Sequence, residues 1–295
     1  ETAYLGLADV YGSALNQPDK AIEASSNARK LAPHSPRSAA ALGLSLFRIG
    51  KQDDAYILLA EAARALPEDS GVQYDYAWAA YSTGRVAEAR AITCKLAPSD
   101  PARAADTRDF LALTDPNATA DPGIPALIER KLTDSPTYVP ALMAAAELLE
   151  MAGKSPLPLY TKVLEVLPQF DPARKALARF YLADPLQLDA AEKLATAAHE
   201  RLKEDSDLSG ILAIINFRKG QFDYAAQLLA EISAKRPLKG PELFALGMSQ
   251  VSTNHADDAR QTLTLALLTK LPQADADTAM ATIEKLEKSS KNEGK

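Results

Sequence analysis

The stretch LGLSLFRIGKQDDA at residues 42–55 is closely similar to the stretch LAIINFRKGQFDYA at residues 212–225. The two stretches begin 170 residues apart, and this distance is five times 34. A pattern that returns at multiples of a period of roughly 20–50 residues is typical of chains built from stacked supersecondary units. The rest of the chain is therefore expected to follow the same period.

Marker residues return along the chain with the 34-residue period. Gly50 returns as Gly84 and Gly220 and is replaced by Asn254 in the last copy, while Ala55 returns as Ala89, Ala225 and Ala259. Between the markers, apolar residues fall at the spacing of one face of a helix. Each unit is therefore predicted to consist of two short amphipathic helices joined by a tight turn.

Each marker has a physical reason to stand where it does. Gly43 on the first helix and Ala55 on the second are small, so two helix backbones can approach each other closely there. Gly50 can adopt the left-handed conformation that ends a helix. Asp53 and Asp54 stand at the start of the second helix, where carboxylates interact favourably with free amide groups and the helix dipole.

These residues resemble those of the tetratricopeptide repeat family, whose unit of about 34 residues is a helix-turn-helix with small residues at the crossing and a proline near its end. Pro67, which returns as Pro237, stands at that last position. The resemblance covers about 270 residues with varying strength. It implies an all-α, right-handed superhelical solenoid of about eight helix-turn-helix repeats with a C-terminal capping helix.

The strength of the repeat divides the chain into segments. Residues 1–114 form an N-terminal array of three good repeats plus the first helix of a degenerate one, residues 115–136 an irregular connector and the second helix of that repeat, residues 137–272 a C-terminal array of four repeats, residues 273–288 a capping helix, and residues 289–295 a disordered tail. The connector sequence DPNATADPGIP allows two interpretations. It is either part of a degenerate repeat or a hinge between two arrays.

The composition excludes several classes of protein. The net charge is −6 and there is no basic stripe, which argues against a nucleic-acid binder. Apolar runs are short and interrupted by charges, so no segment is predicted to span a membrane. A single cysteine, Cys94, excludes an internal disulfide framework and a cysteine metal cluster.

The sequence leaves the compartment open. It begins with Glu1 rather than methionine, so we expect a fragment or a processed chain. A cytoplasmic and a bacterial extracytoplasmic location both fit. The oligomeric state is equally open.

Catalytic signatures are missing from the sequence. His34, His199 and His255 have no second histidine or cysteine at metal-ligand spacing. Cys94 lies in a helical run and is expected to be buried by packing. There is no glycine-rich phosphate loop and no nucleophile-elbow pattern. We therefore predict a protein that is not an enzyme and that needs no metal or cofactor.

The resemblance implies that the first helices of the repeats line a concave groove. By helical periodicity, the residues predicted to face the groove are Arg37, Phe47, Arg48, Tyr74, Trp78 and Tyr81 in one patch and Ile214, Phe217, Arg218, Phe244 and Met248 in a second. Arg37 and Arg48 at the edge favour a partner with apolar anchors and one or two acidic groups. The alternative is that neighbouring repeats cover these aromatic side chains.

Many members of the family hold acidic C-terminal tails with lysine and asparagine at two groove places. This chain has Ala40 and Leu44, then Tyr74 and Trp78, at those places. That departure puts such a clamp in doubt.

We therefore expect a non-catalytic scaffold or adaptor that binds a peptide or helical segment of a partner protein in the groove. The alternative is a structural spacer or oligomerisation segment of a larger bacterial-type envelope, secretion or polysaccharide-export assembly. No nucleic-acid partner is expected, and the partner's identity does not follow from the sequence.

Overall fold

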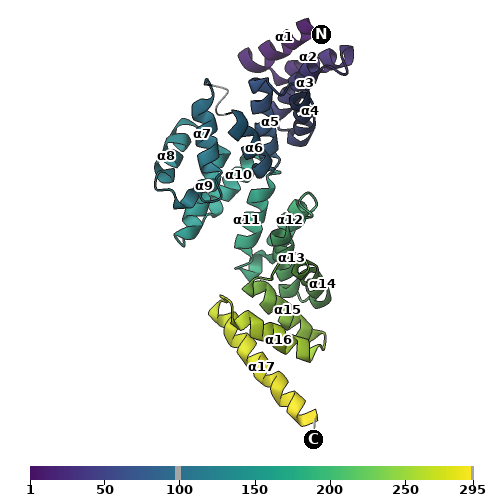
Figure 1. Ribbon diagram of the computed structural model, residues 1–295, viewed down its shortest axis with the longest axis vertical. Helices are drawn as coiled ribbons and strands as arrows, with labels where there is room; N and C mark the ends of the chain where they lie inside the picture. The colour runs from purple at the N-terminus through teal and green to yellow at the C-terminus, as the bar shows by residue number, and fades with distance from the viewer. Residues whose placement is uncertain (97–100, 294–295) are drawn as a thin grey trace. The chain divides into compact units, whose positions relative to one another are not determined.

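The structure is a computed structural model that describes residues 1–96 and 101–293. In these residues every regular element is a helix, so the predicted all-α helical repeat fold is confirmed. The chain forms two compact units, unit 1 (Glu1–Ala173) and unit 2 (Arg174–Lys295). The helices follow one another as antiparallel pairs along the colour gradient of Figure 1.

Unit 1 holds the first ten helices. They are α1 (Thr2–Asp9), which continues into a π-helical turn (Val10–Ala14), α2 (Pro18–Leu31), α3 (Pro36–Arg48), α4 (Gln52–Ala65), α5 (Ser70–Ser82), α6 (Val86–Leu96), α7 (Ala104–Leu113), α8 (Ile124–Asp134), α9 (Val139–Met151) and α10 (Leu157–Val166). A short 3₁₀ turn, Ala118–Ala120, precedes α8.

Helix α11 (Asp171–Tyr181) begins at the end of unit 1 and continues into unit 2. The remaining helices are α12 (Leu188–His199), which follows a 3₁₀ turn (Pro185–Gln187), α13 (Ser206–Arg218), α14 (Phe222–Ser233), α15 (Gly240–Ser252), α16 (Ala256–Leu267) and α17 (Gln273–Glu293).

The predicted turn residues have the predicted backbone conformation. Gly50, Gly84 and Gly220 have φ angles of 80°, 82° and 78°, and Asn254 has a φ of 62°. A glycine adopts this left-handed conformation without steric cost, and asparagine is one of the few other residues that tolerate it. Each turn therefore joins the two helices of a pair at the place where the 34-residue period predicts it.

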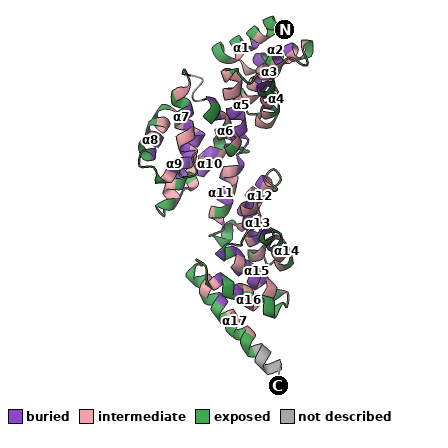
Figure 2. Ribbon diagram, viewed as in Figure 1, coloured by how far each residue is buried: buried purple, intermediate pink, exposed green. Residues whose placement is uncertain are grey.

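The helices of a pair cross at the small residues. Ala55, Ala89, Ala225 and Ala259 are all fully buried. A Cβ atom placed on Gly43 would lie 2.8 Å from Cγ of Leu59, and one placed on Gly247 would lie 2.7 Å from the same atom of Leu263. Buried residues accordingly gather where paired helices meet (Figure 2).

The connector at residues 115–125 belongs to unit 1 and contributes to a core. Ala118 and Ile124 are buried in one cluster with Leu113, Ile128 and Ala141. Arg90 of α6 also holds the start of the connector, because its Nη2 atom lies 2.8 Å from Oδ2 of Asp115. Such packing is what the degenerate-repeat interpretation requires. The predicted segment boundaries, which are set by repeats rather than by compact units, stay a prediction.

Helix α17 closes the C-terminal end of unit 2. Ala279 is fully buried against Phe244, Leu263 and Ala266. The helix extends to Glu293, beyond the predicted capping segment, and residues 294–295 of the predicted tail lie outside the described residues. Among the described helices, none combines the length and the apolar character needed to cross a bilayer.

Candidate partner-binding trough

Unit 1 contains an open apolar hollow between first helices. A hollow of about 330 Å³ is lined by Leu44 and Phe47 of α3, Tyr74, Asp75 and Trp78 of α5, and Tyr138 just before α9. We call this hollow, together with the two that adjoin it, the trough. Ligand pockets of comparable size are lined in the same way, mainly by apolar and aromatic side chains with a few polar groups.

The two adjoining hollows share lining residues with the central one. One, of about 160 Å³, lies beside α1 and shares Leu44 and Asp75 with the central hollow. The other, of about 350 Å³, shares Phe47, Trp78 and Tyr138 with it. The six central residues therefore belong to one continuous depression in unit 1.

Local sequence fixes the two helices that supply most of the lining. Ser35 caps α3, since its Oγ atom accepts a hydrogen bond from the Ser38 amide. Asp69 caps α5 by accepting hydrogen bonds of 3.1 Å from the amides of Gly71 and Val72. Because each start is fixed, residues three and four apart on each helix point to the same side. This periodicity brings the α3 and α5 side chains to the trough.

Trp78 stands at the centre of an aromatic cluster. Its ring centroid lies 6.3 Å from that of Tyr74, 5.4 Å from that of Phe110 and 5.7 Å from that of Tyr138. These rings meet edge to face, which is a favoured arrangement for aromatic pairs. Tyr81 lies beneath, only 2% exposed, and contacts both Trp78 and Phe110. The cluster therefore gives the trough a fixed aromatic floor.

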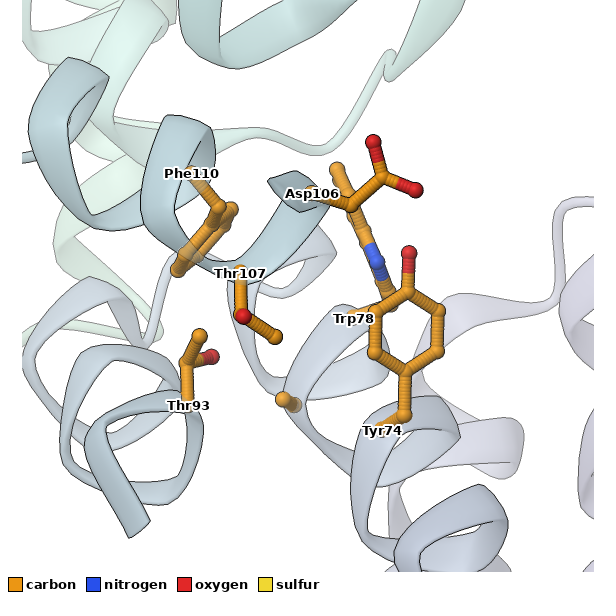
Figure 3. Close-up of a pocket in the computed structure, with 7 residues that line it drawn as sticks. Tyr74, Trp78, Thr93, Asp106, Thr107 and Phe110 are labelled. Carbon is orange, nitrogen blue, oxygen red and sulfur yellow. The ribbon is translucent and has the colours of Figure 1, made fainter. Parts of the chain in front are cut away.

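One side of Trp78 is closed by α7. Figure 3 shows Tyr74 and Trp78 on α5 facing Asp106, Thr107 and Phe110 of α7, with Thr93 of α6 below. The space left among them is about 10 Å³, which holds no more than about one water molecule. Access to Trp78 is therefore from the trough side.

Asp75 is the charged group of the central hollow. Within residues 1–96 and 101–293, no hydrogen bond or ion pair reaches its carboxylate. Burial raises the pKa of this carboxyl group to about 6, although the charges of Arg103 and Arg48 act in the opposite direction. Desolvation thus outweighs the nearby positive charge.

The two arginines near Asp75 are directed elsewhere. Nη2 of Arg48 donates a hydrogen bond of 3.3 Å to Oγ of Ser13, and its guanidinium packs against Gly12. The guanidinium of Arg103 lies 4.9 Å from the centre of the Tyr74 ring. Both therefore influence Asp75 only at longer range.

The structure brings together most of the first predicted patch. Phe47, Tyr74 and Trp78 line the trough, and Arg48 lines both adjoining hollows. Tyr81 is part of the floor rather than the exposed lining. Arg37, in the first turn of α3, is exposed and does not line the central hollow.

The apolar residues of the second predicted patch pack in or against the core of unit 2. Phe244 is 8% exposed, and Phe217 packs against it with ring centroids 5.9 Å apart. Met248 and Ile283 of α17 border the same cluster, while Ile214 packs against the neighbouring one. The Arg218 guanidinium donates a hydrogen bond to the Leu182 carbonyl. Phe244 is therefore buried, Ile214, Phe217 and Met248 are half-buried beside it or the neighbouring cluster, and Arg218 is exposed.

Two residues of the central hollow were missed by reasoning from the sequence. Asp75 is the only charged residue of α5, and this isolated charge in an otherwise uncharged helix was a usable signal. Tyr138 precedes α9 and reaches Trp78 only because α7 and α8 fold back. No periodic marker in the sequence points to it.

The expectation for Cys94 was wrong, because this thiol is exposed. On α6 the buried positions are Ala89, Thr93 and Leu96, and Cys94 lies outside that stripe. In the described part of the chain, no cluster of three or more histidine, cysteine or acidic side chains could hold a metal ion.

Comparison with solved structures finds similar folds among tetratricopeptide repeat proteins. One, from Parabacteroides merdae, is 14% identical, with 97% of this chain and 100% of that chain covered and a TM-score of 0.41. The P58(IPK) tetratricopeptide domain is 11% identical, covers 98% of each chain and has a TM-score of 0.40. The domain TPR2AB of yeast Sti1, in its complex with pHSP90, is 16% identical, with 97% and 98% covered and a TM-score of 0.33.

No protein-family model matches the chain, and no curated protein matches it either. The similarity to these structures is one of fold at low sequence identity.

Proposed function

We propose that the chain is a non-catalytic scaffold of the tetratricopeptide repeat type, and that the trough of unit 1 binds an extended or helical segment of a partner protein. The observation that carries this proposal is the trough itself. The central hollow shares Leu44 with one adjoining hollow and Phe47, Trp78 and Tyr138 with the other, and an aromatic cluster around Trp78 supports them. Binding energy at protein interfaces comes mainly from aromatic and arginine anchors in pockets of this kind.

A peptide selection experiment tests the proposal. A random peptide library is selected on the intact chain, and selected peptides are titrated while the fluorescence of Trp78, the single tryptophan, is monitored. Binding in the trough changes the surroundings of Trp78. The variant Phe47→Ala removes one wall and should weaken binding by about 2 kcal/mol or more.

Matched variants separate lost contacts from lost folding. Ile57→Ala changes an apolar residue on α4 that is 62% exposed and lies outside the trough lining, so it should leave binding unchanged. Leu44→Ala provides a second change in the trough, should Phe47→Ala melt early. Peptides that bind Phe47→Ala and Leu44→Ala as tightly as the wild type would contradict the proposal.

The alternative is that the chain is an oligomerisation segment. Analytical sedimentation, which measures the oligomeric state of the chain, tests it. If the chain self-associates and Phe47→Ala makes it monomeric, the trough is an interface between copies and the peptide-binding proposal fails. A chain that stays monomeric and binds selected peptides supports the scaffold function.

A further inference from the structure

The trough contains a negative charge in apolar surroundings. Asp75 lines both the central hollow and the one beside α1, and its neighbours in the central hollow are Leu44, Phe47, Trp78 and two tyrosines. No group in residues 1–96 or 101–293 hydrogen-bonds or pairs with it. A carboxylate in such surroundings is unfavourable unless a counter-charge reaches it.

The arginines of unit 1 do not supply that counter-charge. Arg48 is held by Ser13, and Arg103 lies over the Tyr74 ring. Asp9 adds a second carboxylate to the hollow beside α1, where Arg48 is the only basic side chain of the lining. The pKa of Asp75, raised to about 6, shows that the desolvation is not compensated. At neutral pH the group is nevertheless mostly ionised.

The rest of the lining favours a cation as well. Phe47, Tyr74, Trp78 and Tyr138 place four aromatic side chains around the same hollow as the carboxylate. Aromatic faces attract cations, tryptophan most strongly, and the attraction grows when water is excluded. Long basic side chains also place an apolar stem along such walls while their charged ends reach a polar group.

We propose that the trough recognises a basic side chain, lysine or arginine, of the partner segment, with its charged end at Asp75 and its stem between Phe47 and Trp78. This inference rests on the proposed function and specifies the partner's chemistry. It replaces the expectation of acidic partner groups, which rested on Arg37 and Arg48. Neither lines the central hollow, and the charged residue that does is acidic.

A series of short peptides tests the inference. The probes are acetyl-Ala-Leu-X-Leu-Ala-amides in which X is arginine, citrulline, glutamate or leucine, titrated at about pH 7.5 with Trp78 fluorescence as the readout. Citrulline has nearly the shape of arginine without its charge. In the wild type, the arginine peptide should bind at least about tenfold more tightly than the citrulline peptide, and the glutamate peptide should bind most weakly.

Asp75→Asn assigns this preference to the carboxylate. The variant keeps the size of the side chain and should bind the arginine and citrulline peptides equally, with a melting temperature no lower than that of the wild type. Asp54→Asn, at an exposed position of α4, is the matched control and should keep the full preference. Equal affinities for arginine and citrulline in the wild type, or a preference that survives Asp75→Asn, would overturn the inference.

The leucine peptide separates the two proposals. If it binds the trough but arginine brings no gain, the scaffold function stands and only the cation site is rejected. If no peptide of the series changes Trp78 fluorescence while library peptides bind with the expected sensitivity to Phe47→Ala, the cation site is again rejected. If neither set binds, both proposals are overturned.

Discussion

In unit 1 the large side chains on the inward face of α3 and α5 line an open hollow, whereas in unit 2 the side chains at the same repeat places of α13 and α15 pack against a core. Phe47 and Trp78 border the trough. Their counterparts Phe217 and Met248 border a cluster that Ala279 of α17 completes. The difference lies in the neighbouring elements, since α17 packs against the face in unit 2 while the face in unit 1 stays open at the trough. A repeat place therefore predicts the direction of a side chain, but not which elements pack beside it.

The two units also differ in how they satisfy charge. In unit 2, Glu242 is only 3% exposed, yet it is fully paired, because Arg236 lies 2.7 Å from Oε1 and the Lys239 amide donates to Oε2. In unit 1, Asp75 has no such partner within the described residues. A buried carboxylate with partners contributes to the stability of the fold, whereas a carboxylate without partners in an open hollow is available to bind a ligand.

The largest effect is expected from Glu242→Ala in unit 2. It leaves Arg236 without its bidentate partner. Arg236 keeps its ion pair with Asp207 at 3.2 Å, so the loss should be about 3 kcal/mol, the lower end of what breaking a buried pair costs. Thermal unfolding monitored by circular dichroism measures the loss of stability. The exposed Glu231→Ala on α14 is the control and should change stability by less than about 0.5 kcal/mol. If both variants melt at the same temperature, the pairing of Glu242 contributes no stability. The contrast between a paired carboxylate in unit 2 and an unpaired one in unit 1 would then have no effect on stability.

The second effect is a pH dependence specific to unit 1. The pKa of Asp75 is about 6 in the folded chain, against 3.8 for an ordinary aspartate. Between these values the folded chain binds more protons than the unfolded chain, so raising the pH from about 4 to 7 should lower stability, by at most about 3 kcal/mol. Arg48, Arg103 and Asp69 act on the same group and are included in this direction.

Asp75→Asn isolates that contribution. The variant should be more stable than the wild type at about pH 7.5 and nearly equal to it at about pH 4, because the wild-type carboxyl is protonated there. Denaturant unfolding at both pH values gives the difference in free energy. A stability gain that is the same at both values, or a loss at neutral pH, would show that Asp75 does not carry an uncompensated charge.

The third effect should be alike in both units. Gly43→Leu and Gly247→Leu each insert a branched side chain where a Cβ alone would lie within 3 Å of a leucine on the paired helix. Overpacking of this kind typically costs about 1–3 kcal/mol. Melting temperatures of the two variants provide the comparison. If one glycine tolerates leucine and the other does not, the helix pairs of the two units are not equivalent at their crossings.

The smallest effect is expected at Cys94. Because the thiol is exposed on α6, Cys94→Ser should change stability by no more than about 0.5 kcal/mol. In the folded wild type, a thiol reagent should label it as rapidly as in the denatured chain. If the folded chain protects Cys94 from labelling, the cysteine is packed as the sequence predicted, and a different side of α6 is exposed.

The repeat pattern determined the parts of the fold that depend on local backbone chemistry. Gly50, Gly84 and Asn254 mark turns because few residues tolerate a positive φ, and Gly43 and Ala55 mark crossings because larger side chains do not fit. These requirements are met by residues close in sequence or one helix away. The helix pairs and their register were therefore predictable from the sequence alone.

The accessibility of the candidate site was decided only by tertiary structure. Tyr138 reaches Trp78 from sixty positions further along the chain, and the packing around Asp75 raises the pKa of its carboxyl group, while no described residue forms an ion pair with it. In unit 2, by contrast, α17 fills the space beside Phe244 and Met248. Exposure and desolvation depend on every element that packs around a side chain, and helical periodicity specifies only the face on which that side chain lies.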